Sequence, residues 1–227
     1  AATVLLVDDL VSDGVLAHAS PKARVVHVGK RGGCKSTPQA FIEKLMIMAA
    51  REGEVVVRLK GGDPFIFGRG GEEVEHLREA GIEVQVLNGI TAGLAGLTSL
   101  GAPLTHRDHA HGVVFITGHA KPGDSGTDWQ ALAATARDAR LTLVIYMGVS
   151  SAAAIQADLL TGLPASTPLA IIQHASLPQQ RHAVCTLGTL TATLAAEGLG
   201  SPSVIVVGDV VRGVAAVAQP QSQRHAA

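Results

Sequence analysis

Short apolar runs rich in β-branched residues alternate with helix-like segments along the first half of the chain, and this alternation restricts the possible folds more than any other feature. Strands are predicted at residues 4–7, 23–28, 55–59 and 82–87, and helices at residues 39–52, 72–80 and 91–100. Strand–helix–strand successions of this kind form parallel βαβ units. Gly81 directly follows the second helix, where a left-handed residue commonly ends a helix. The first half is therefore predicted to be an α/β domain.

A second series of elements begins after the polar stretch 105–111. Strands are predicted at residues 113–117, 141–147, 169–173, 182–186 and 204–207, and helices at 128–138, 151–160 and 190–197. Asp128 is a predicted N-cap, and Gly162 and Gly198 are predicted helix ends. No helix separates the strands near Leu169 and His182, so an antiparallel pair is expected there. The chain is thus predicted to form two α/β domains, residues 1–107 and 108–227, with a disordered tail from about residue 219.

Composition excludes several classes of protein. Hydrophobic residues make up 47% of the chain and aromatic residues only 3%, which suits parallel strands packed under helices of small residues. The formal net charge is −1 and no block of five like charges occurs, so the electrostatic footprint of a nucleic-acid-binding protein is missing. No apolar run reaches membrane-spanning length and no signal peptide is recognised. A cytoplasmic protein that binds neither nucleic acid nor membrane is predicted.

Cysteine and histidine spacing gives no metal prediction. Cys34 and Cys185 are far apart and belong to no CxxC pair, so two free thiols are expected. His106, His109 and His111 could converge only within a loop, and the segment lacks the acidic or cysteine partners that complete most metal sites. A polar linker explains these histidines more simply, and no metal is predicted.

The stretch Val55–Glu73, VVVRLKGGDPFIFGRGGEE, is the strongest candidate for a ligand-binding loop. Its β-prone run ends at Gly61, Gly62, Asp63 and Pro64. Two adjacent glycines permit positive φ and allow a ligand to approach the main chain closely. Small ligands bind at the carboxyl ends of the strands in open parallel sheets. A plain strand-to-helix turn would use the same residues, and the loop alone does not decide between the two interpretations.

The longer pattern GGDPFIFGRGGEE resembles the signature of the tetrapyrrole methylase family. Five further blocks that resemble the family occur in the expected order: VDDLVS at 7–12, VGKRGG at 28–33, GITAG at 89–93, PLTHRD at 103–108 and YMG at 146–148. Together the blocks cover most of the chain, although each one alone would be a weak signal. The resemblance implies two α/β domains of the tetrapyrrole methylase type, with the cofactor in the cleft between them, and a homodimer.

The resemblance also implies an activity. It indicates S-adenosyl-L-methionine-dependent C-methylation of uroporphyrinogen III at C2 and C7, giving precorrin-2 for sirohaem or cobalamin biosynthesis and S-adenosyl-L-homocysteine as the second product. The FIFGRGGEE extension and the HRD of the fifth block favour this tetrapyrrole substrate. Another family member, such as a later precorrin methyltransferase or diphthine synthase, is the alternative. A non-catalytic nucleotide-binding α/β protein is a further alternative, although neither a helix-opening G-x-G-x-x-G nor a P-loop occurs.

The resemblance implies that residues of two motif loops and of the second domain contact the cofactor. The residues implied are Gly61, Gly62, Asp63, Ile66, Thr91, Ala92, Met147 and Ala175. Without the resemblance, Met147 would be interpreted as core filling. Where the family commonly has Asn-Gly-Thr, this chain has His174, Ala175 and Ser176. Ala175 can replace the glycine as a backbone contact only if its φ is negative.

Methylation of a substituted pyrrole carbon leaves a cation that must lose a proton, so a base and an acid are expected partners. The resemblance implies Asp8 as proton acceptor and Lys30 as proton donor. The first block departs from the family pattern, because Val7 replaces the usual tyrosine and Asp9 adds a second carboxylate. Successive strand residues point to opposite faces, so Asp8 and Asp9 are not expected to share one site.

The expected substrate carries eight carboxylates, which arginine binds through charge-assisted hydrogen bonds. Arg31, Arg69 and Arg107 lie in or beside the motif loops and are the predicted substrate-binding residues. The family normally has an earlier strand and a GxGxGD-type loop that contributes to the cofactor pocket. This chain opens almost directly into the strand at residue 4, so we expect its first domain to lack that strand and loop.

Overall fold

The computed structural model describes residues 2–29, 37–120 and 123–217. Lys30, Arg31, Cys34 and the tail predicted to be disordered lie outside these residues. The described chain divides into two compact units, Ala1–Thr91 and Ala92–Ala227. The predicted domain boundary at residues 107 and 108 falls later, because the small-residue helix α4 (Ala92–Ser99) packs against strands of the second unit.

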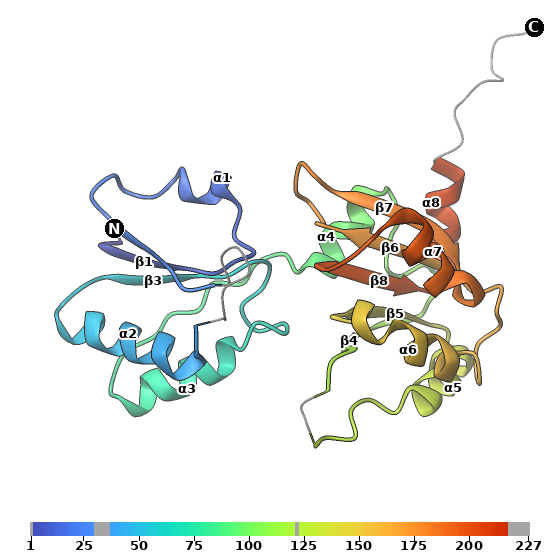
Figure 1. The fold of residues 1–227 in the computed structure, drawn as a ribbon, viewed down its shortest axis with the longest axis horizontal. Helices are drawn as coiled ribbons and strands as arrows, with labels where there is room; N and C mark the ends of the chain where they lie inside the picture. The colour runs from blue at the N-terminus through green and yellow to red at the C-terminus, as the bar shows by residue number, and fades with distance from the viewer. Residues whose placement is uncertain (1, 30–36, 121–122, 218–227) are drawn as a thin grey trace, which may run out of the picture. The chain divides into compact units, whose positions relative to one another are not determined.

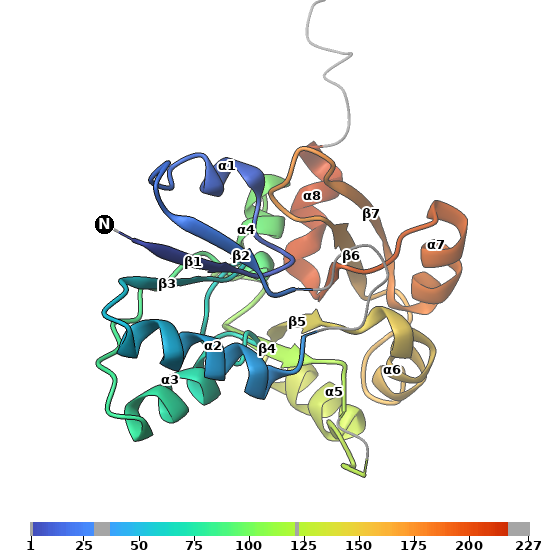
Figure 2. The ribbon, with the colours of Figure 1, turned by 60° about the vertical axis from the view of Figure 1, so that its left-hand side comes forward.

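The first unit is built on a parallel three-stranded sheet. Its central strand, β1 (Val4–Val7), pairs with β2 (Arg24–His27) on one side and with β3 (Val56–Leu59) on the other. Helix α1 (Asp13–Leu16) follows β1, α2 (Gln39–Arg51) precedes β3, and α3 (Gly70–Glu79) follows it. Helices α2 and α3 lie together on one face of the sheet (Figures 1 and 2). The predicted βαβ arrangement of this half is confirmed.

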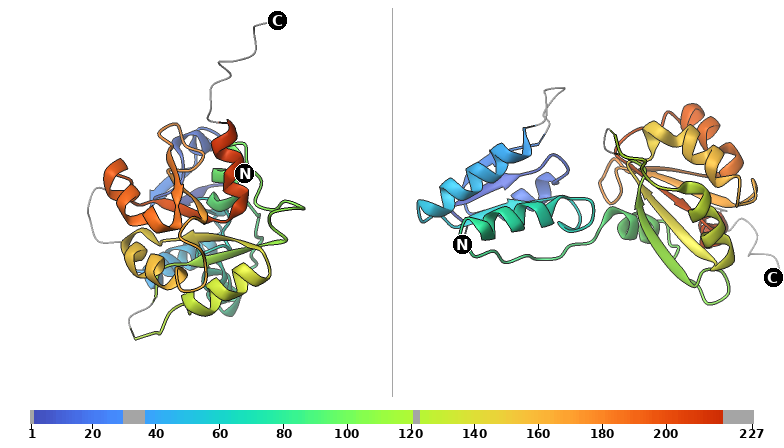
Figure 3. Two further views of the ribbon diagram at one scale, coloured as in Figure 1. Left: turned by 90° about the vertical axis from the view of Figure 1, so that its right-hand side faces the viewer. Right: turned by 90° about the horizontal axis from the view of Figure 1, so that it is seen from below.

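The side chains of β1 point alternately to the two faces of the sheet, and this explains where the hydrophobic core of the first unit lies. Val4 and Leu6 point to the face covered by α2 and α3, where they pack with Ile42, Met46 and Leu77. The helices present apolar residues at helical spacing to that face. The right-hand view of Figure 3 shows the two helices side by side along the sheet.

The predicted strand at residues 82–87 is wrong, since no strand is assigned there. Ile82 and Val84 still pack against the core of the first unit, while Glu83 and Gln85 are exposed. The alternating pattern therefore reflects burial of one side of an extended segment without ladder hydrogen bonds. Gly81, just before it, has φ of 77°, which confirms the predicted left-handed helix end.

The second unit contains a mixed five-stranded sheet. Its order is β4 (Gly112–Thr117), β5 (Leu141–Tyr146), β8 (Ser203–Val207), β6 (Pro168–Gln173) and β7 (Arg181–Thr186). β4 and β5 are parallel, and the other neighbours are antiparallel. The expected antiparallel pair is β6 with β7, so that prediction is confirmed.

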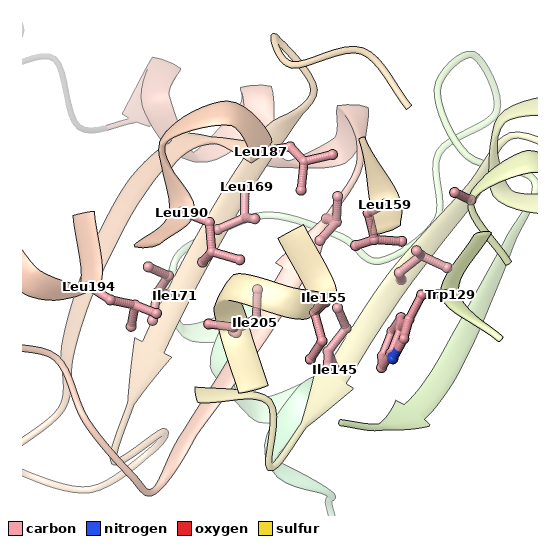
Figure 4. Packing of buried hydrophobic residues seen from close by; sticks show 14 of the residues in the cluster. Trp129, Ile145, Ile155, Leu159, Leu169, Ile171, Leu187, Leu190, Leu194 and Ile205 are labelled. Atoms are coloured by element: carbon pink, nitrogen blue, oxygen red, sulfur yellow. The ribbon is translucent and has the colours of Figure 1, made fainter. Parts of the chain in front are cut away.

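Helices cover both faces of the second sheet. On one face α5 (Trp129–Asp138), α6 (Ala152–Leu159) and α7 (Leu190–Glu197) pack over Ile145, Ile171 and Ile205, as Figure 4 shows. On the other face, residues of α4 and of α8 (Arg212–Val217) pack over the alternate strand residues. Burial on both faces explains why the central strands β5, β8 and β6 are mainly apolar.

Several helix ends follow the sequence signals. The Asp128 side chain accepts a hydrogen bond from the Ala131 N–H at 3.0 Å, which confirms it as the N-cap of α5. Gly198 ends α7 with φ of 58°. The short helices α1 and α8 were not predicted, nor were the single 3-10 turns Val149–Ser151, Leu187–Thr189 and Asp209–Val211. Such short elements lack enough periodicity to be recognised.

Candidate active site

Loops that follow the three strands of the first unit meet at the carboxyl edge of its sheet. A Cβ added to Gly29, after β2, would overlap the backbone of Asp9, after β1. A Cβ on Gly61, after β3, would lie 2.8 Å from the carbonyl oxygen of Leu10. Glycine is thus required at both positions for close packing of the backbones. Parallel strands bring three loops to one edge, as expected for a ligand site.

Asp63 fastens the loop after β3 to the segment before α4. Its Oδ1 accepts a hydrogen bond from the Phe65 N–H at 2.8 Å, and its Oδ2 accepts one from the Gly89 N–H at 3.1 Å. A Cβ on Gly89 would overlap the carbonyl oxygen of Gly62. The GGDP and GITAG motifs are therefore in direct backbone contact. Asp63 acts here as a clamp between loops, and its predicted contact with the cofactor stays a prediction.

The clamp leaves backbone groups available to a ligand. Gly61 and Gly62 are exposed, and within the described residues their amides and carbonyls make no hydrogen bond to other backbone groups. Ile66 beside them is 36% exposed, while Thr91 is buried. Free backbone donors and acceptors next to an apolar side chain suit the polar groups and the aliphatic chain of S-adenosyl-L-methionine. The donor set thus fits the cofactor that the sequence predicts.

Four charged side chains form a cluster beneath this edge, on the face covered by α2 and α3. Arg58 Nη2 lies 3.1 Å from Asp8 Oδ2, and Arg58 Nε lies 3.2 Å from Glu73 Oε1. Lys60 Nζ lies 3.6 Å from the same Asp8 oxygen and 3.3 Å from Glu73 Oε2. Gln39 Nε2 donates a further hydrogen bond to Glu73 at 2.9 Å. We call Asp8, Arg58, Lys60 and Glu73 the ionic cluster.

Asp8 is the outermost member of the ionic cluster. Its side chain is 35% exposed, whereas the other three are between 4% and 11% exposed. Its Oδ1 accepts the N–H of Asp9 at 3.0 Å, so both carboxylate oxygens are oriented. Asp9 is exposed and belongs to none of the ion pairs of the described residues. The two carboxylates have different surroundings, as expected, but both lie beyond the end of β1 and Asp9 is in a turn, so strand alternation is not the reason.

The predicted substrate-binding arginines differ in their surroundings. Arg69 has φ of 57°, precedes α3 and pairs with Glu72 one turn later. The hydrogen bond to Glu72 raises the pKa of the Arg69 guanidinium above its ordinary value. Arg107 is exposed in the turn between His106 and Ala110, and within the described chain it has no polar partner. Lys30 and Arg31 lie outside the described residues, so their predicted roles stay predictions.

In the second unit, Tyr146 positions the first turn of α4. Its hydroxyl accepts a hydrogen bond from the Gly93 N–H at 2.7 Å. A Cβ on Gly93 would lie 2.5 Å from Val144 Cγ1, so only glycine allows this approach. The GITAG and YMG motifs thus contact each other through Gly93 and Tyr146. Met147 follows with φ of 53° and is 47% exposed, so it is not a core residue.

The loop after β6 holds Ala175 between two residues with positive φ, His174 at 52° and Ser176 at 65°. Ala175 itself is not among the residues with positive φ, which meets the condition set for its predicted backbone contact. Gln180 fixes the loop, because its Oε1 accepts the Ser176 N–H at 2.6 Å and its Nε2 donates to Ser99 Oγ at 2.8 Å. Ser99 ends α4, so the loop is held against that helix.

Among residues 2–29, 37–120 and 123–217, no group of three histidine, cysteine or acidic side chains could hold a metal ion. The rings of His106 and His109 instead stack, with centroids 4.6 Å apart. No helix in the part of the chain that the structure describes is long and apolar enough to cross a membrane.

Comparison with known proteins identifies the family. The model of the tetrapyrrole (corrin/porphyrin) methylases matches residues 1–191. This chain belongs to that family. Among curated tetrapyrrole methylases, the chain is 51% identical over 222 residues to the uroporphyrinogen-III C-methyltransferase of Pseudomonas aeruginosa, covering 97% of this chain and 87% of the relative. It is 50% identical over 211 residues to siroheme synthase 1 of Aeromonas hydrophila, covering 92% of this chain and 44% of that protein.

Solved tetrapyrrole methylase structures have the same fold. The uroporphyrin-III C-methyl transferase of Thermus thermophilus, complexed with S-adenyl homocysteine, has a TM-score of 0.75 and 38% identity, covering 93% of this chain and 88% of that one. A cobalt precorrin-4 methyltransferase has a TM-score of 0.78 at 22% identity, with 91% and 83% of the two chains covered. At that identity the second similarity shows the fold alone.

The sequence analysis did not single out Arg58, Lys60 and Glu73 in the first unit, or the contact of Tyr146 in the second. Arg58 and Lys60 are two residues apart at the end of an apolar strand, so they share the face of the strand that α2 and α3 cover. Buried cations on a core face need anionic partners, and this signal was available in the sequence. Glu73 could not be found in this way, since glutamates in the first turn of a helix are usually exposed.

Proposed function

We propose that this chain transfers methyl groups from S-adenosyl-L-methionine to C2 and C7 of uroporphyrinogen III, giving precorrin-2 and S-adenosyl-L-homocysteine. The observation that carries the proposal is the 51% identity over 97% of the chain to a relative named for this reaction. The carboxyl-edge loops of the first unit support it, because their free backbone groups suit the cofactor. Sirohaem or cobalamin biosynthesis would use the product.

The chain's own residues have separate tasks in this proposal. Gly61 and Gly62 bind the cofactor through their backbones, and Ile66 excludes water beside it. Thr91, Ala92, Met147 and Ala175 are the further proposed cofactor contacts. When bound, S-adenosyl-L-methionine supplies the methyl group on a positively charged sulfonium. Alignment and desolvation by the loops then contribute several kcal/mol to lowering the barrier, about 7 to 11 at best in well-aligned systems.

Proton movements follow the transfer of each methyl group. Asp8 is the proposed acceptor of the proton that the methylated ring must lose, and Lys30 the proposed donor. A positioned acid or base of this kind contributes about 10²–10⁴-fold to a rate. Arg31, Arg69 and Arg107 are proposed to bind substrate carboxylates by charge-assisted hydrogen bonds. Arg69 exchanges its partner Glu72 for the substrate when it does so.

We also propose that the enzyme is a cytoplasmic homodimer, as the family resemblance implies. Light scattering coupled to size-exclusion chromatography measures the mass directly. A mass of two chains supports the dimer, and a mass of one chain at assay concentrations contradicts it.

The activity is tested with purified protein, uroporphyrinogen III kept reduced and S-adenosyl-L-methionine, followed by mass spectrometry of the tetrapyrrole. A product with two added methyl groups is expected. Asp8→Asn should lower kcat by about 10²-fold or more, while Asp13→Asn in α1, the matched control, should not. Methylation only of an already methylated corrinoid would overturn the assignment in favour of a later precorrin methyltransferase.

A further inference from the structure

The loop after β6 has a strained backbone on both sides of one proposed cofactor contact. His174 and Ser176 have φ of 52° and 65°, the left-handed region that is costly for residues with a side chain, and Ala175 lies between them. Strain of this kind persists only where the surrounding structure enforces it, and it recurs at active sites and ligand clamps. Contacts within the second unit must therefore hold this loop in its conformation.

The side chain of Gln180 supplies such a contact at the far end of the loop. Its Oε1 accepts a hydrogen bond from the Ser176 N–H at 2.6 Å, and its Nε2 donates one to Ser99 Oγ at 2.8 Å. The Ser99 hydroxyl donates in turn to the carbonyl oxygen of Gly96 at 2.7 Å. One neutral amide group therefore links the strained residue Ser176 to the last turn of α4.

Helix α4 also contacts the middle of the loop. A Cβ added to Gly96, which is buried in this helix, would lie 3.3 Å from the Cβ of Ala175. The methyl group of Ala175 thus packs where the glycine leaves room. Ala92, another proposed cofactor contact, lies in the first turn of the same helix, which Tyr146 positions. Two proposed contacts therefore depend on one helix that is anchored at its start by Tyr146 and at its end by Gln180.

We propose that Gln180 is a positioning residue for the methyl donor. Through Ser99 it holds the segment 174–176 against α4, so that the backbone of Ala175 is presented to S-adenosyl-L-methionine in its strained conformation. In this role Gln180 acts through the Ser176 N–H rather than by contact with the reacting atoms. The inference rests on the proposed function, in which Ala175 contacts the cofactor, and it adds a residue outside the motif positions predicted to bind it.

A merely structural role for Gln180 makes a different prediction. Loss of a hydrogen bond that only supports the fold lowers the free energy of unfolding, but the molecules that stay folded bind the ligand with unchanged affinity. Loss of a bond that sets the loop conformation weakens binding by folded molecules, because the relaxed loop must be ordered again when the ligand binds. Isothermal titration calorimetry with S-adenosyl-L-homocysteine separates the two roles, since the dissociation constant and the binding-competent fraction are measured independently.

The test compares variants of the full chain. Gln180→Met removes both hydrogen bonds at similar volume, and Ser99→Ala removes only the link to α4. Gln180→Glu is the conservative change, because a carboxylate still accepts the Ser176 N–H and the Ser99 hydroxyl, 3.2 Å from Gln180 Oε1, can donate to it. Gln179→Met is the matched control, since Gln179 is exposed and its side chain makes no hydrogen bond within the described residues. Circular dichroism and urea unfolding show whether each variant is folded.

Gln180→Met should weaken binding of S-adenosyl-L-homocysteine about tenfold, the effect of losing one well-placed hydrogen bond. Ser99→Ala should weaken it about threefold, while Gln180→Glu and Gln179→Met should stay within about twofold of the unchanged protein. The double variant Gln180→Met/Ser99→Ala should bind no more weakly than Gln180→Met, because both changes break the same link. In the methylation assay, Gln180→Met should raise KM for S-adenosyl-L-methionine about tenfold, with kcat and KM for uroporphyrinogen III within about twofold.

An unchanged dissociation constant in Gln180→Met, with only its unfolding midpoint lowered, would overturn the inference. An equal rise of KM for uroporphyrinogen III and for the methyl donor would do the same. If Gln180→Met does not fold, Ser99→Ala carries the test, and unchanged affinity in that variant would be the contradicting result. A chain that binds S-adenosyl-L-homocysteine with the expected dependence on Gln180 but does not methylate uroporphyrinogen III would refute the proposed function and leave the inference standing.

Discussion

Replacing Gly89 by alanine tests how closely the GGDP loop and the GITAG segment, the two proposed cofactor-binding motifs, must approach each other. A Cβ at this position overlaps the carbonyl oxygen of Gly62, and the Gly89 N–H is also bonded to Asp63 at 3.1 Å. The atoms involved are backbone, so no flexible side chain can absorb the overlap. The segment 89–91 must move away from the GGDP loop by about 1 Å, a displacement that costs about 10²-fold when it misplaces bound groups.

Isothermal titration calorimetry with S-adenosyl-L-homocysteine measures this effect directly. We expect Gly89→Ala to weaken binding by about a hundredfold, or about 2.7 kcal/mol. Gly71→Ala is the control, because a Cβ on Gly71 in α3 would have no atom within 4 Å. The control should bind normally and be more stable by about 0.5–1 kcal/mol, since alanine favours a helix over glycine. Unchanged affinity in Gly89→Ala would refute the interpretation of these loops as the cofactor site.

Four further predictions address other parts of the molecule. Tyr146→Phe leaves the buried Gly93 N–H without its acceptor and should cost about 1–3 kcal/mol in urea unfolding; a loss below about 0.3 kcal/mol would argue against the positioning role. Leu143→Ala in the fully buried core of the second unit should cost about 2–5 kcal/mol, against almost nothing for Leu87→Ala at a 75% exposed position. Arg69→Met should raise KM for uroporphyrinogen III about tenfold while affinity for S-adenosyl-L-homocysteine stays unchanged, with Arg78→Met in α3, the helix that Arg69 precedes, as control; equal loss of both affinities would contradict the assignment. Burial raises the pKa of the Cys185 thiol, so in a Cys34→Ser variant iodoacetamide should alkylate the folded chain more slowly than the urea-unfolded chain near pH 8. The difference between the two alkylation rates should become smaller as the pH rises, and equal rates at pH 8 would contradict the raised pKa.

Most of the fold could be predicted from the sequence, because the strands follow burial patterns that residue types reveal. The mainly apolar runs of β5, β6 and β8 indicate strands buried on both faces, and these strands are buried in the structure. The segment 82–87 shows the limit of this reasoning. An extended segment that is buried on one side shows the same alternation of apolar and polar residues as a hydrogen-bonded strand. The alternation therefore does not reveal whether the segment pairs with a neighbouring strand.

The candidate site was predicted only in part. Gly61 was singled out because adjacent glycines permit close approach to the main chain, and the structure shows such an approach by the backbone of Leu10. Gly29 and Gly89 were recognised only as parts of longer motifs, and their overlaps with Asp9 and Gly62 appear only in the folded chain. The clamping role of Asp63 and the hydroxyl contact of Tyr146 depend on which backbone amides lie nearby, and only the folded chain determines that. The same is true of Glu73, whose importance comes from two cations at the end of another element.

A crystal structure of this protein grown with S-adenosyl-L-homocysteine tests the central claim most directly. We expect ligand density against the backbones of Gly61 and Gly62, beside Ile66 and Thr91, with the Asp63 carboxylate still bonded to the Gly89 N–H. Density at any other place, with the GGDP loop free of ligand, would contradict the assignment of this sheet edge as the methyl-donor site.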